Sequence, residues 1–404
     1  MLGTNQEYAK SYNLRIVLEA IRTNGPLSRA DVARATRLTR QTISNIVDEL
    51  LSQHLVSETG RQQGRRGTPA TLLEFQPKAA YSIGFDLDQA HLTAVLMDLN
   101  GAVEVRYQER LNYPSPQESL EKMTHLTEQL LEQQNLPRSK ICGVGIGVPG
   151  PMRMLDSAKD QRQVINPHGF PGWENTPIAE HLAERLDLPV QLENNATAAA
   201  IGESFYGAGQ GLKHFFYVFL GMGLGGGLFI QGQPFHGLGG NAGEIGFLPI
   251  QNAGRYEQLG YFFSADMLFN MLRAQGHDIK QLEDLAHLLA QDDPDLLAWL
   301  DQAADHLARA LLSVEYLVDP EALIVGGSWP VPVLEHLIQD LRQHINSGRI
   351  QHKSYAPELM LSHAGEDAAV LGVATLPIYH MLTPLHHIHK EAAPQSRLFT
   401  GVLS

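Results

Sequence analysis

The chain of 404 residues contains a single cysteine, Cys142, and no long apolar run. One cysteine excludes a disulfide within the chain and any zinc site built from several cysteines. No apolar stretch approaches the roughly 18 residues that a membrane-spanning helix needs, so we expect no membrane partner. The sequence also lacks a secretory signal, which favours a cytoplasmic protein.

Charged residues make up only 18% of the sequence, whereas hydrophobic residues make up 43%. With 37 glycines and 22 prolines spread along the chain, this composition excludes collagen-like, coiled-coil and wholly disordered proteins. Domains mostly hold about 100–200 residues, so the length predicts two or three globular domains.

Negative charge predominates in the whole chain but not at its amino-terminal end. The formal net charge is −14, whereas residues 1–75 contain ten Lys and Arg against seven Asp and Glu. That segment therefore carries +3, and the rest of the chain carries −17. A mildly basic head on an acidic body is typical of a polyanion-binding module joined to a regulatory body.

The basic head has the pattern of a helix-turn-helix. Apolar residues at helical spacing predict a first helix that stops at Asn24-Gly25-Pro26. Ser28 and Thr39 are the predicted N-caps of two further helices, with Asp31 as the capping-box partner of Ser28. The predicted buried face of the third helix comprises Ile43, Ile46, Val47 and Leu50.

Polar side chains lie opposite that buried face. Gln41 and Asn45 carry the donor and acceptor that match the major-groove edge of adenine, although an ordinary solvated helix face would also be polar. The segment from Val56 to Leu73 predicts a β-hairpin wing with a basic, glycine-rich tip, which favours DNA binding. The predicted DNA contacts are Arg40, Gln41, Ser44, Asn45, Arg65 and Arg66.

From Ala79 onward, short apolar strands alternate with amphipathic helices, which predicts two α/β lobes with a ligand cleft between them. The second lobe has a predicted glycine loop over Gly221–Gly227. The predicted strands are Tyr81–Leu87, Leu92–Asp98, Val103–Arg110, a segment beginning at Ile141, Phe215–Gly221, Leu228–Ile230 and Ala322–Val325.

Several motifs of the body resemble those of the ROK family, which groups repressors and sugar kinases. The matching segments are Gly143–Pro151, Asn166–Trp173, Leu192–Ala200, Gly221–Gly227 with Gly237–Gly246, and Asp319–Gly327. The resemblance favours the repressor branch and implies an α/β chain, with a winged helix-turn-helix head followed by a two-lobed actin/hexokinase-like ATPase fold. It places the head at residues 1–78, the first lobe at 79–200, and the second lobe at 201–404, with a C-terminal helix that packs back on the first lobe.

Departures from the family pattern argue against phosphoryl transfer. The resemblance implies an Asp general base where this chain has Asn195, and an amide cannot accept the proton of a sugar hydroxyl. Asp88 stands in the first phosphate loop, where a carboxylate would repel ATP phosphates, and Met222 replaces a Thr in the second loop. We therefore expect no catalytic residues, no enzyme activity and no ATP requirement.

The family's structural zinc site is also lost. Where relatives have a zinc-binding His, this chain has Phe247, and no cysteine follows it. A sugar-binding Glu of the family aligns with Gly260. We therefore expect neither a metal nor a cofactor. Clustered histidines near the C-terminus could bind a transition metal, but solvated side chains are the simpler interpretation: they are His380, His386, His387 and His389.

Part of the family's sugar site is retained. The predicted ligand residues are Asn194, Asn195, Glu244 and His168. Two amides and one carboxylate supply the donors and acceptors that vicinal hydroxyls require. The alternative is a degenerate cleft in which Glu244 and Asn194 merely satisfy loop backbone groups, with His168 as a bystander.

These observations predict a transcriptional regulator of carbohydrate metabolism that acts as a repressor. Its partners would be a double-stranded DNA operator and a small-molecule sugar or sugar phosphate, and it would form a homodimer or a tetramer of two dimers. Two alternatives stay open, a sugar kinase with an accessory DNA-binding head and a DNA-binding dimer that senses no ligand.

Overall fold

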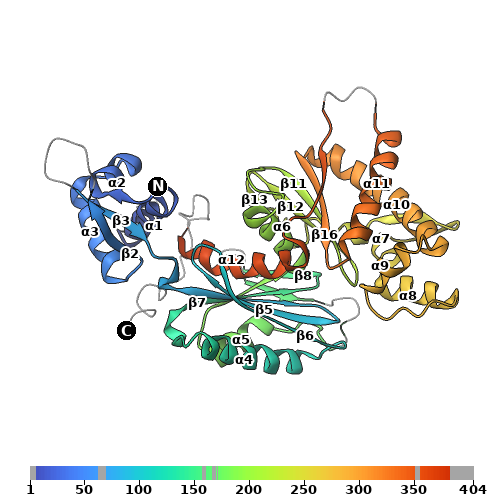
Figure 1. Cartoon of the computed structure of the whole chain (residues 1–404), viewed down its shortest axis with the longest axis horizontal. Coiled ribbons are helices and arrows are strands. Elements are labelled where there is room, and N and C mark those ends of the chain that lie inside the picture. Colours follow the sequence, from blue (N-terminus) through green and yellow to red (C-terminus); the bar gives the residue numbers. More distant parts are fainter. Residues whose placement is uncertain are drawn as a thin grey trace.

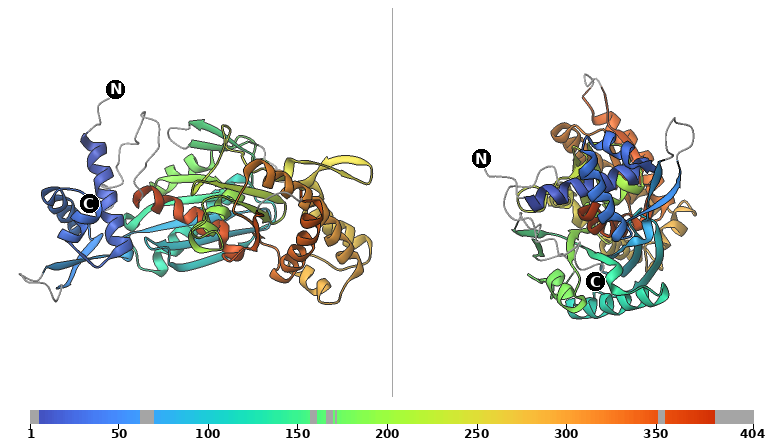
Figure 2. Two further views of the ribbon diagram at one scale, coloured as in Figure 1. Left: turned by 90° about the horizontal axis from the view of Figure 1, so that it is seen from above. Right: turned by 90° about the vertical axis from the view of Figure 1, so that its left-hand side faces the viewer.

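The computed structural model describes residues 6–61, 70–156, 161–165, 170, 172–350 and 355–382. A small head lies at one end of the molecule, followed by two α/β lobes (Figures 1 and 2). In the part of the chain that the structure describes, no helix is long and apolar enough to cross a membrane.

The head is a winged helix-turn-helix, as the sequence predicted. Its elements are α1 (Gln6–Asn24), β1 (Leu27–Ser28), α2 (Arg29–Thr36), α3 (Arg40–Ser52), β2 (Val56–Arg61) and β3 (Thr71–Phe75). The hydroxyl of Ser28 accepts from the Asp31 N–H and that of Thr39 from the Thr42 N–H, so both predicted N-caps are confirmed. β2 and β3 pair antiparallel as the predicted wing, and β3 also pairs with β1.

The first lobe is built on a five-stranded sheet of order β10-β7-β4-β5-β6. Its elements are β4 (Tyr81–Leu87), β5 (His91–Asp98), β6 (Val103–Arg110), α4 (Pro116–Gln133), β7 (Ile141–Val148), β8 (Met152–Asp156), β9 (Gln161–Val164), α5 (Ile178–Leu186) and β10 (Val190–Asn194). α4 and α5 pack in one apolar cluster with the sheet, while β8 and β9 form a separate hairpin. β4 and β7 are buried on both faces, and β7 accordingly contains only apolar residues and glycine.

The second lobe has a sheet of order β13-β12-β11-β16-β17. Its strands are β11 (Phe215–Leu220), β12 (Leu224–Ile230), β13 (Gln233–Pro234), β16 (Ala322–Gly327) and β17 (Glu358–Leu361), with a separate hairpin of β14 (Pro249–Asn252) and β15 (Arg255–Gln258). Its helices are α7 (Leu259–Phe262), α8 (Ala265–Ala274), α9 (Asp284–Leu289), α10 (Pro294–Val318) and α11 (Val331–Gly348). These helices lie at the end of the molecule away from the head (Figure 1).

The glycine-rich segment after β11 differs from the prediction. We expected a loop as far as Gly227, but β12 already begins at Leu224. A Cβ at Gly225 would lie 2.7 Å from the Cβ of Ala196, and one at Gly227 would lie 2.7 Å from the Ala196 carbonyl oxygen. These glycines are therefore required by the close approach of helix α6 (Asn195–Tyr206) to a strand, not by a loop.

Two helices, α6 and α12 (Ala368–Leu382), join the lobes. α6 packs on β11 and β12 as well as β10, and α12 packs on β4, β5 and β7. A Cβ at Gly202 would overlap the carbonyl oxygen of Ala368, and one at Gly372 would overlap that of Ala198. The two backbones therefore touch, and the expected lobe boundary after residue 200 falls inside the continuous helix α6.

The head rests on the carboxyl-terminal end of α12, which reaches it from the centre of the body (Figure 2). Ile378 and Leu382 of α12 belong to the same buried apolar cluster as Leu18 and Ile21 of α1. That cluster also contains Cys142 of β7, and burial raises the pKa of its thiol to about 12. The head is thus packed on the body through a shared core.

Candidate functional site

The exposed face of α3 carries the residues predicted to read bases. Gln41 and Asn45 are both exposed, and Gln41 Nε2 donates a hydrogen bond to Asn45 Oδ1 at 3.1 Å. Arg40, the first residue of the helix, is exposed as well. Gln41 and Asn45 lie one turn apart in the amino-terminal half of α3, which is the part of a recognition helix that contacts base edges.

Ser44 is held more tightly inside the head. It is half-buried, and its hydroxyl accepts a hydrogen bond from Arg29 Nη1 at 3.2 Å. Arg29 also forms ion pairs with Asp48 at 2.9 Å and Glu58 at 3.7 Å. Arg29 therefore links α2 to both α3 and β2, a role that no local pattern signals. The other predicted contacts, Arg65 and Arg66, lie outside the described residues.

Predicted ligand residues of the body meet where the two lobes join. Asn194 ends β10, Asn195 begins α6, and Glu244 follows β13 in the second lobe. Asn194 Nδ2 donates to Glu244 Oε1 at 3.4 Å, and a Cβ at Gly150 would lie 2.6 Å from both of these atoms. We call Gly150, Asn194, Asn195 and Glu244 the lobe junction. The fourth predicted ligand residue, His168, lies outside the described residues.

The polar side chains of the lobe junction differ in how many of their atoms already have a hydrogen-bond partner. Asn194 Oδ1 caps α6 by accepting from the N–H groups of Ala196 at 2.8 Å and Thr197 at 3.2 Å. Asn195 is buried, and its side chain has no hydrogen bond within the part of the chain that is described. Burial raises the pKa of Glu244 to about 7. Asn195 and Glu244 therefore retain most of the capacity to bind a ligand.

A buried charge network that the sequence analysis missed underlies the lobe junction. Glu193 Oε1 accepts from the Asn194 N–H at 2.9 Å, while Glu193 Oε2 is hydrogen-bonded to Arg162 Nη1 and, at 2.8 Å, to His236 Nε2. Burial alone would raise the pKa of Glu193, but the charges and hydrogen bonds of Arg162 and His236 lower it to about 2. The network connects β9 and β10 to the loop after β13, and so ties the first lobe to the second.

In the loop between β4 and β5, which resembles the family's first phosphate loop, an aspartate binds the backbone amides of the same loop. Asp88 Oδ1 accepts hydrogen bonds from the backbone N–H groups of Ala90 at 2.7 Å and His91 at 2.6 Å. They belong to the segment that resembles the family's first phosphate loop. Burial, followed by the charges of Asp88 and Asp367, raises the pKa of Asp86 well above its ordinary value. The loop does not fit a nucleotide triphosphate, because a carboxylate already occupies its donors.

The second phosphate loop is closed in a similar way. The Gly221 N–H donates to the Gly223 carbonyl at 2.9 Å, and the Gly221 carbonyl accepts from Trp329 Nε1 at 2.9 Å. Met222, at the position of the family's Thr, packs against the apolar core of the second lobe. The Met222 side chain is therefore directed to the core of the second lobe.

The segment aligned with the family's zinc site does not fit a zinc ion. Phe247 is about half exposed at 49%, and an aromatic ring offers no ligand atom. Gly260 packs against Gly246, since a Cβ at Gly260 would lie 3.1 Å from the Gly246 carbonyl oxygen. A side chain at this position would therefore require the backbone at Gly246 to shift by a few tenths of an ångström.

One other group of potential metal ligands occurs among the described residues, formed by His277, Asp293 and Asp295. His277 Nε2 lies 3.1 Å from Asp295 Oδ2, and Asp293 Oδ1 caps α10 by accepting from the N–H groups of Asp295 and Leu296. The positive end of the α10 dipole disfavours a cation at this position. The group is a hydrogen-bonded helix cap. His386, His387 and His389 lie outside the described residues.

Comparisons with known proteins agree with these features. A sequence model of the ROK family matches residues 82–379, and one of the MarR family matches residues 15–67. The chain is 27% identical to the xylose repressor of Bacillus subtilis (strain 168), over 94% of this chain and 98% of that protein. It is 31% identical to the glucokinase of Thermotoga maritima, over 58% of this chain and 78% of that enzyme.

A solved structure supports the same fold. The crystal structure of a ROK family transcriptional regulator, described as a homolog of the Escherichia coli MLC protein, superposes with a TM-score of 0.75 at 21% identity. The superposition covers 98% of this chain and 99% of that one. The predicted resemblance and the predicted fold class, a winged head on a two-lobed sugar-kinase-like body, are confirmed.

Proposed function

The chain belongs to the ROK family, and on that premise we propose that it is a DNA-binding repressor of carbohydrate metabolism controlled by a sugar or sugar phosphate. The observation that carries the proposal is the union of a MarR-type head and a ROK body in one chain, which is similar over 94% of its length to a xylose repressor. Gln41 and Asn45, exposed on α3, support base recognition by the head.

We propose further that the body has no kinase activity. Asn195 offers no proton acceptor to a sugar hydroxyl, and the carboxylate of Asp88 occupies the amides that a phosphate would need. The rival function, a sugar kinase with an accessory head, draws support from glucokinases, but the example from Thermotoga maritima matches only 58% of this chain.

In this proposal the sugar binds at the lobe junction, through Asn195 and Glu244 with Asn194 and His168. Asn194 caps α6, α6 touches α12 along its backbone, and α12 ends under the head. A ligand that moves the lobes therefore moves the head. A coupling of about 1–3 kcal/mol would change DNA affinity roughly 5–150-fold.

The DNA contacts in this proposal are Arg40, Gln41, Ser44 and Asn45 on α3, with Arg65 and Arg66 on the wing. We propose that two copies of the chain form a homodimer whose heads occupy two half-sites of a pseudo-palindromic operator. The spacing of the half-sites would then depend on how the bodies are arranged, and a sugar would change it.

The decisive experiment measures DNA binding by fluorescence anisotropy, with duplexes tiled across the promoter next to the chain's own coding region. We expect one duplex to bind much more tightly than random duplexes, and D-xylose, D-glucose or another sugar of a panel to change that affinity. Gln41→Ala should relax the preference at one base pair, with a loss of about 1–3 kcal/mol of discrimination. Equal binding of all duplexes would contradict the proposal.

Two further measurements separate the alternatives. A coupled ATPase assay with the same sugars tests for a kinase, and turnover of ~1 s⁻¹ or faster would overturn our interpretation of Asn195 and Asp88. A thermal shift assay tests for a dimer that senses no ligand. A sugar at 100 times its Kd stabilises the protein by about 2.7 kcal/mol, so no shift with any sugar would favour that alternative.

A further inference from the structure

Apart from Arg15, which has an interaction of its own, the cations among residues 6–61 of the head fall into two groups. Four of them form ion pairs with carboxylates of the head, namely Lys10, Arg22, Arg29 and Arg34. Three others are exposed and have no hydrogen bond or ion pair within the residues that the structure describes, namely Arg37, Arg40 and Arg61. Within the described part of the head, the unpaired positive charge therefore lies just before and at the start of α3 and at the end of the wing strand β2.

Arg37 adopts an unfavourable backbone conformation. It is the C-cap of α2 and lies in the left-handed region, with φ 58° and ψ 21°. This region strains a residue that has a Cβ but not a glycine. Most other non-glycine residues with positive φ among the described residues are Asn, Asp or His, whose short polar side chains tolerate it better. A long, unpaired arginine at such a position indicates a side chain kept for an external partner.

We infer that Arg37 binds the phosphate backbone of duplex DNA, with Arg61 as a second contact of the same kind on the wing side. This inference rests on the proposed function. In a helix-turn-helix the recognition helix enters the major groove, and the residues just before it lie at the edge of the groove beside the phosphates. Arg37 precedes the first residue of α3 by three positions and is exposed, which places it in the turn that would lie at the edge of the groove read by Gln41 and Asn45.

The chemistry of the side chain fits this partner. A guanidinium can donate two parallel hydrogen bonds to a phosphate, and it stays charged at any physiological pH. Contacts to phosphate fix the orientation of the protein but carry no sequence information. Arg37 and Arg61 should therefore strengthen binding to every duplex alike, in contrast to Gln41 and Asn45.

The test is the affinity of Arg37→Gly for a random-sequence 30-base-pair duplex, measured by anisotropy as a function of salt concentration. Each lost phosphate contact reduces the slope of log K against log salt by about 0.9. We expect a loss of about 3–10-fold in affinity near 0.1 M salt. Since glycine relieves the left-handed strain, the same variant should unfold at a temperature a few degrees higher.

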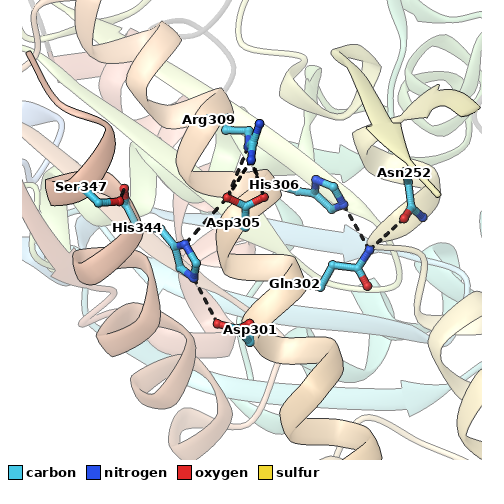
Figure 3. Close-up of polar contacts among 8 residues, drawn as sticks. All are labelled: Asn252, Asp301, Gln302, Asp305, His306, Arg309, His344 and Ser347. Carbon is cyan, nitrogen blue, oxygen red and sulfur yellow. Dashed lines mark hydrogen bonds and ion pairs between the residues drawn. The ribbon is translucent and has the colours of Figure 1, made fainter. Parts of the chain in front are cut away.

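Two further variants serve as controls, and a third, Arg61→Ala, tests the contact on the wing side. Arg37→Lys keeps the charge and should retain most of the salt slope. Arg61→Ala should lose affinity and slope in the same way as Arg37→Gly. Arg309→Ala removes a positive charge from the body, where Arg309 on α10 is exposed and hydrogen-bonded to Asp305 at 3.1 Å (Figure 3). This last variant should bind DNA like the parent.

The outcomes are distinguishable. A more stable Arg37→Gly that binds both the random duplex and the preferred duplex more weakly, by the same factor, supports the inference. Unchanged affinity and slope would overturn it, because the arginine would then serve the turn alone. Weaker binding of the preferred duplex only would also overturn it, since Arg37 would then contact a base. If the parent chain bound no duplex at low salt, the proposed function itself would fail.

Discussion

At the scale of single residues, the two acidic side chains nearest the lobe junction behave in opposite ways. Glu193 is fully buried yet keeps a pKa of about 2, because Arg162 and His236 outweigh the effect of burial. Glu244 has the weak amide contact of Asn194 and no cation among the described residues, so burial raises its pKa to about 7. Glu193 is therefore an anion that links the two lobes, and Glu244 is the carboxyl that would respond to a ligand in the proposed function.

The raised pKa of Glu244 makes stability depend on pH. The carboxyl titrates near 4.5 in the unfolded chain and near 7 in the folded protein. Between these values the folded state holds a proton that the unfolded state has lost, so this group's contribution to stability falls as the pH rises from 4.5 to 7. Glu244→Gln cannot ionise, and we expect it to be more stable than the parent at pH 8, by on the order of 2 kcal/mol.

This prediction is checked by urea denaturation of the parent and Glu244→Gln at pH 5 and pH 8. The advantage of the variant should be small at pH 5 and largest at pH 8. Glu335→Gln, an exposed position on α11, is the matched control and should show the same stability difference at both values. An advantage of Glu244→Gln that did not grow with pH would contradict the assignment.

The residues that sequence analysis could not find are those whose partners lie far along the chain. Arg162, Glu193 and His236 meet only after β9, β10 and the loop following β13 have been brought together. Asp88 was predicted to repel phosphate. The structure shows in addition that its carboxylate accepts hydrogen bonds from two backbone amides of its own loop. Sequence analysis singled out this side chain, but its hydrogen bonds depend on a loop conformation that the sequence does not specify.

At the scale of elements, local patterns predicted most of the fold. β4 and β6 have the predicted bounds, and both N-caps of the head were visible as Ser and Thr before amphipathic helices. The predicted start of β12, at Leu228, was wrong, because a run of glycines is compatible with a loop and with a closely packed strand. Gly225 and Gly227 make room for α6 rather than for a turn, and nothing local distinguishes the two uses.

The contact between α6 and α12 predicts that a change from Gly to Ala in a helix lowers the stability of this protein. Replacing Gly by Ala inside a helix normally favours the helix by up to about 1 kcal/mol. At Gly372, however, the new methyl group would overlap the carbonyl oxygen of Ala198. We expect Gly372→Ala to destabilise the protein by about 3 kcal/mol, because two backbones in contact must separate.

Thermal and urea unfolding of Gly372→Ala check this expectation. Gly223→Ala is the control, since a Cβ at Gly223 would have no heavy atom within 4 Å beyond its chain neighbours. The control should unfold close to the parent. If Gly372→Ala were as stable as Gly223→Ala, the helices would not be held at backbone contact.

At the scale of the whole molecule, the head is connected to the lobes by packed elements and not only by the chain that joins them. α12 packs on the first sheet and on α6, and its last residues lie in the apolar cluster that also holds the core of the head (Figure 1). A change at the lobe junction can therefore reach the head through packed backbone and side chains. This arrangement supplies the physical link that the proposed sugar response needs.

Weakening that link should uncouple sugar from DNA. Ile378 is 6% exposed in the cluster shared by α12 and α1. We expect Ile378→Ala to keep the thermal shift that an effector sugar produces, while the sugar's effect on DNA affinity falls several-fold. Ile345→Ala, buried on α11 in the second lobe, should lose stability without losing the coupling. Equal coupling in both variants would mean that α12 does not carry the response.

The thiol of Cys142 is buried in this same shared core. Its reactive form is the thiolate, which a pKa of about 12 and burial both suppress in the folded protein. A maleimide or disulfide reagent can therefore modify the native protein only as often as the apolar cluster that buries Cys142 opens. The rate at which Cys142 is modified therefore reports the rate of that opening, and no cysteine needs to be introduced to measure it.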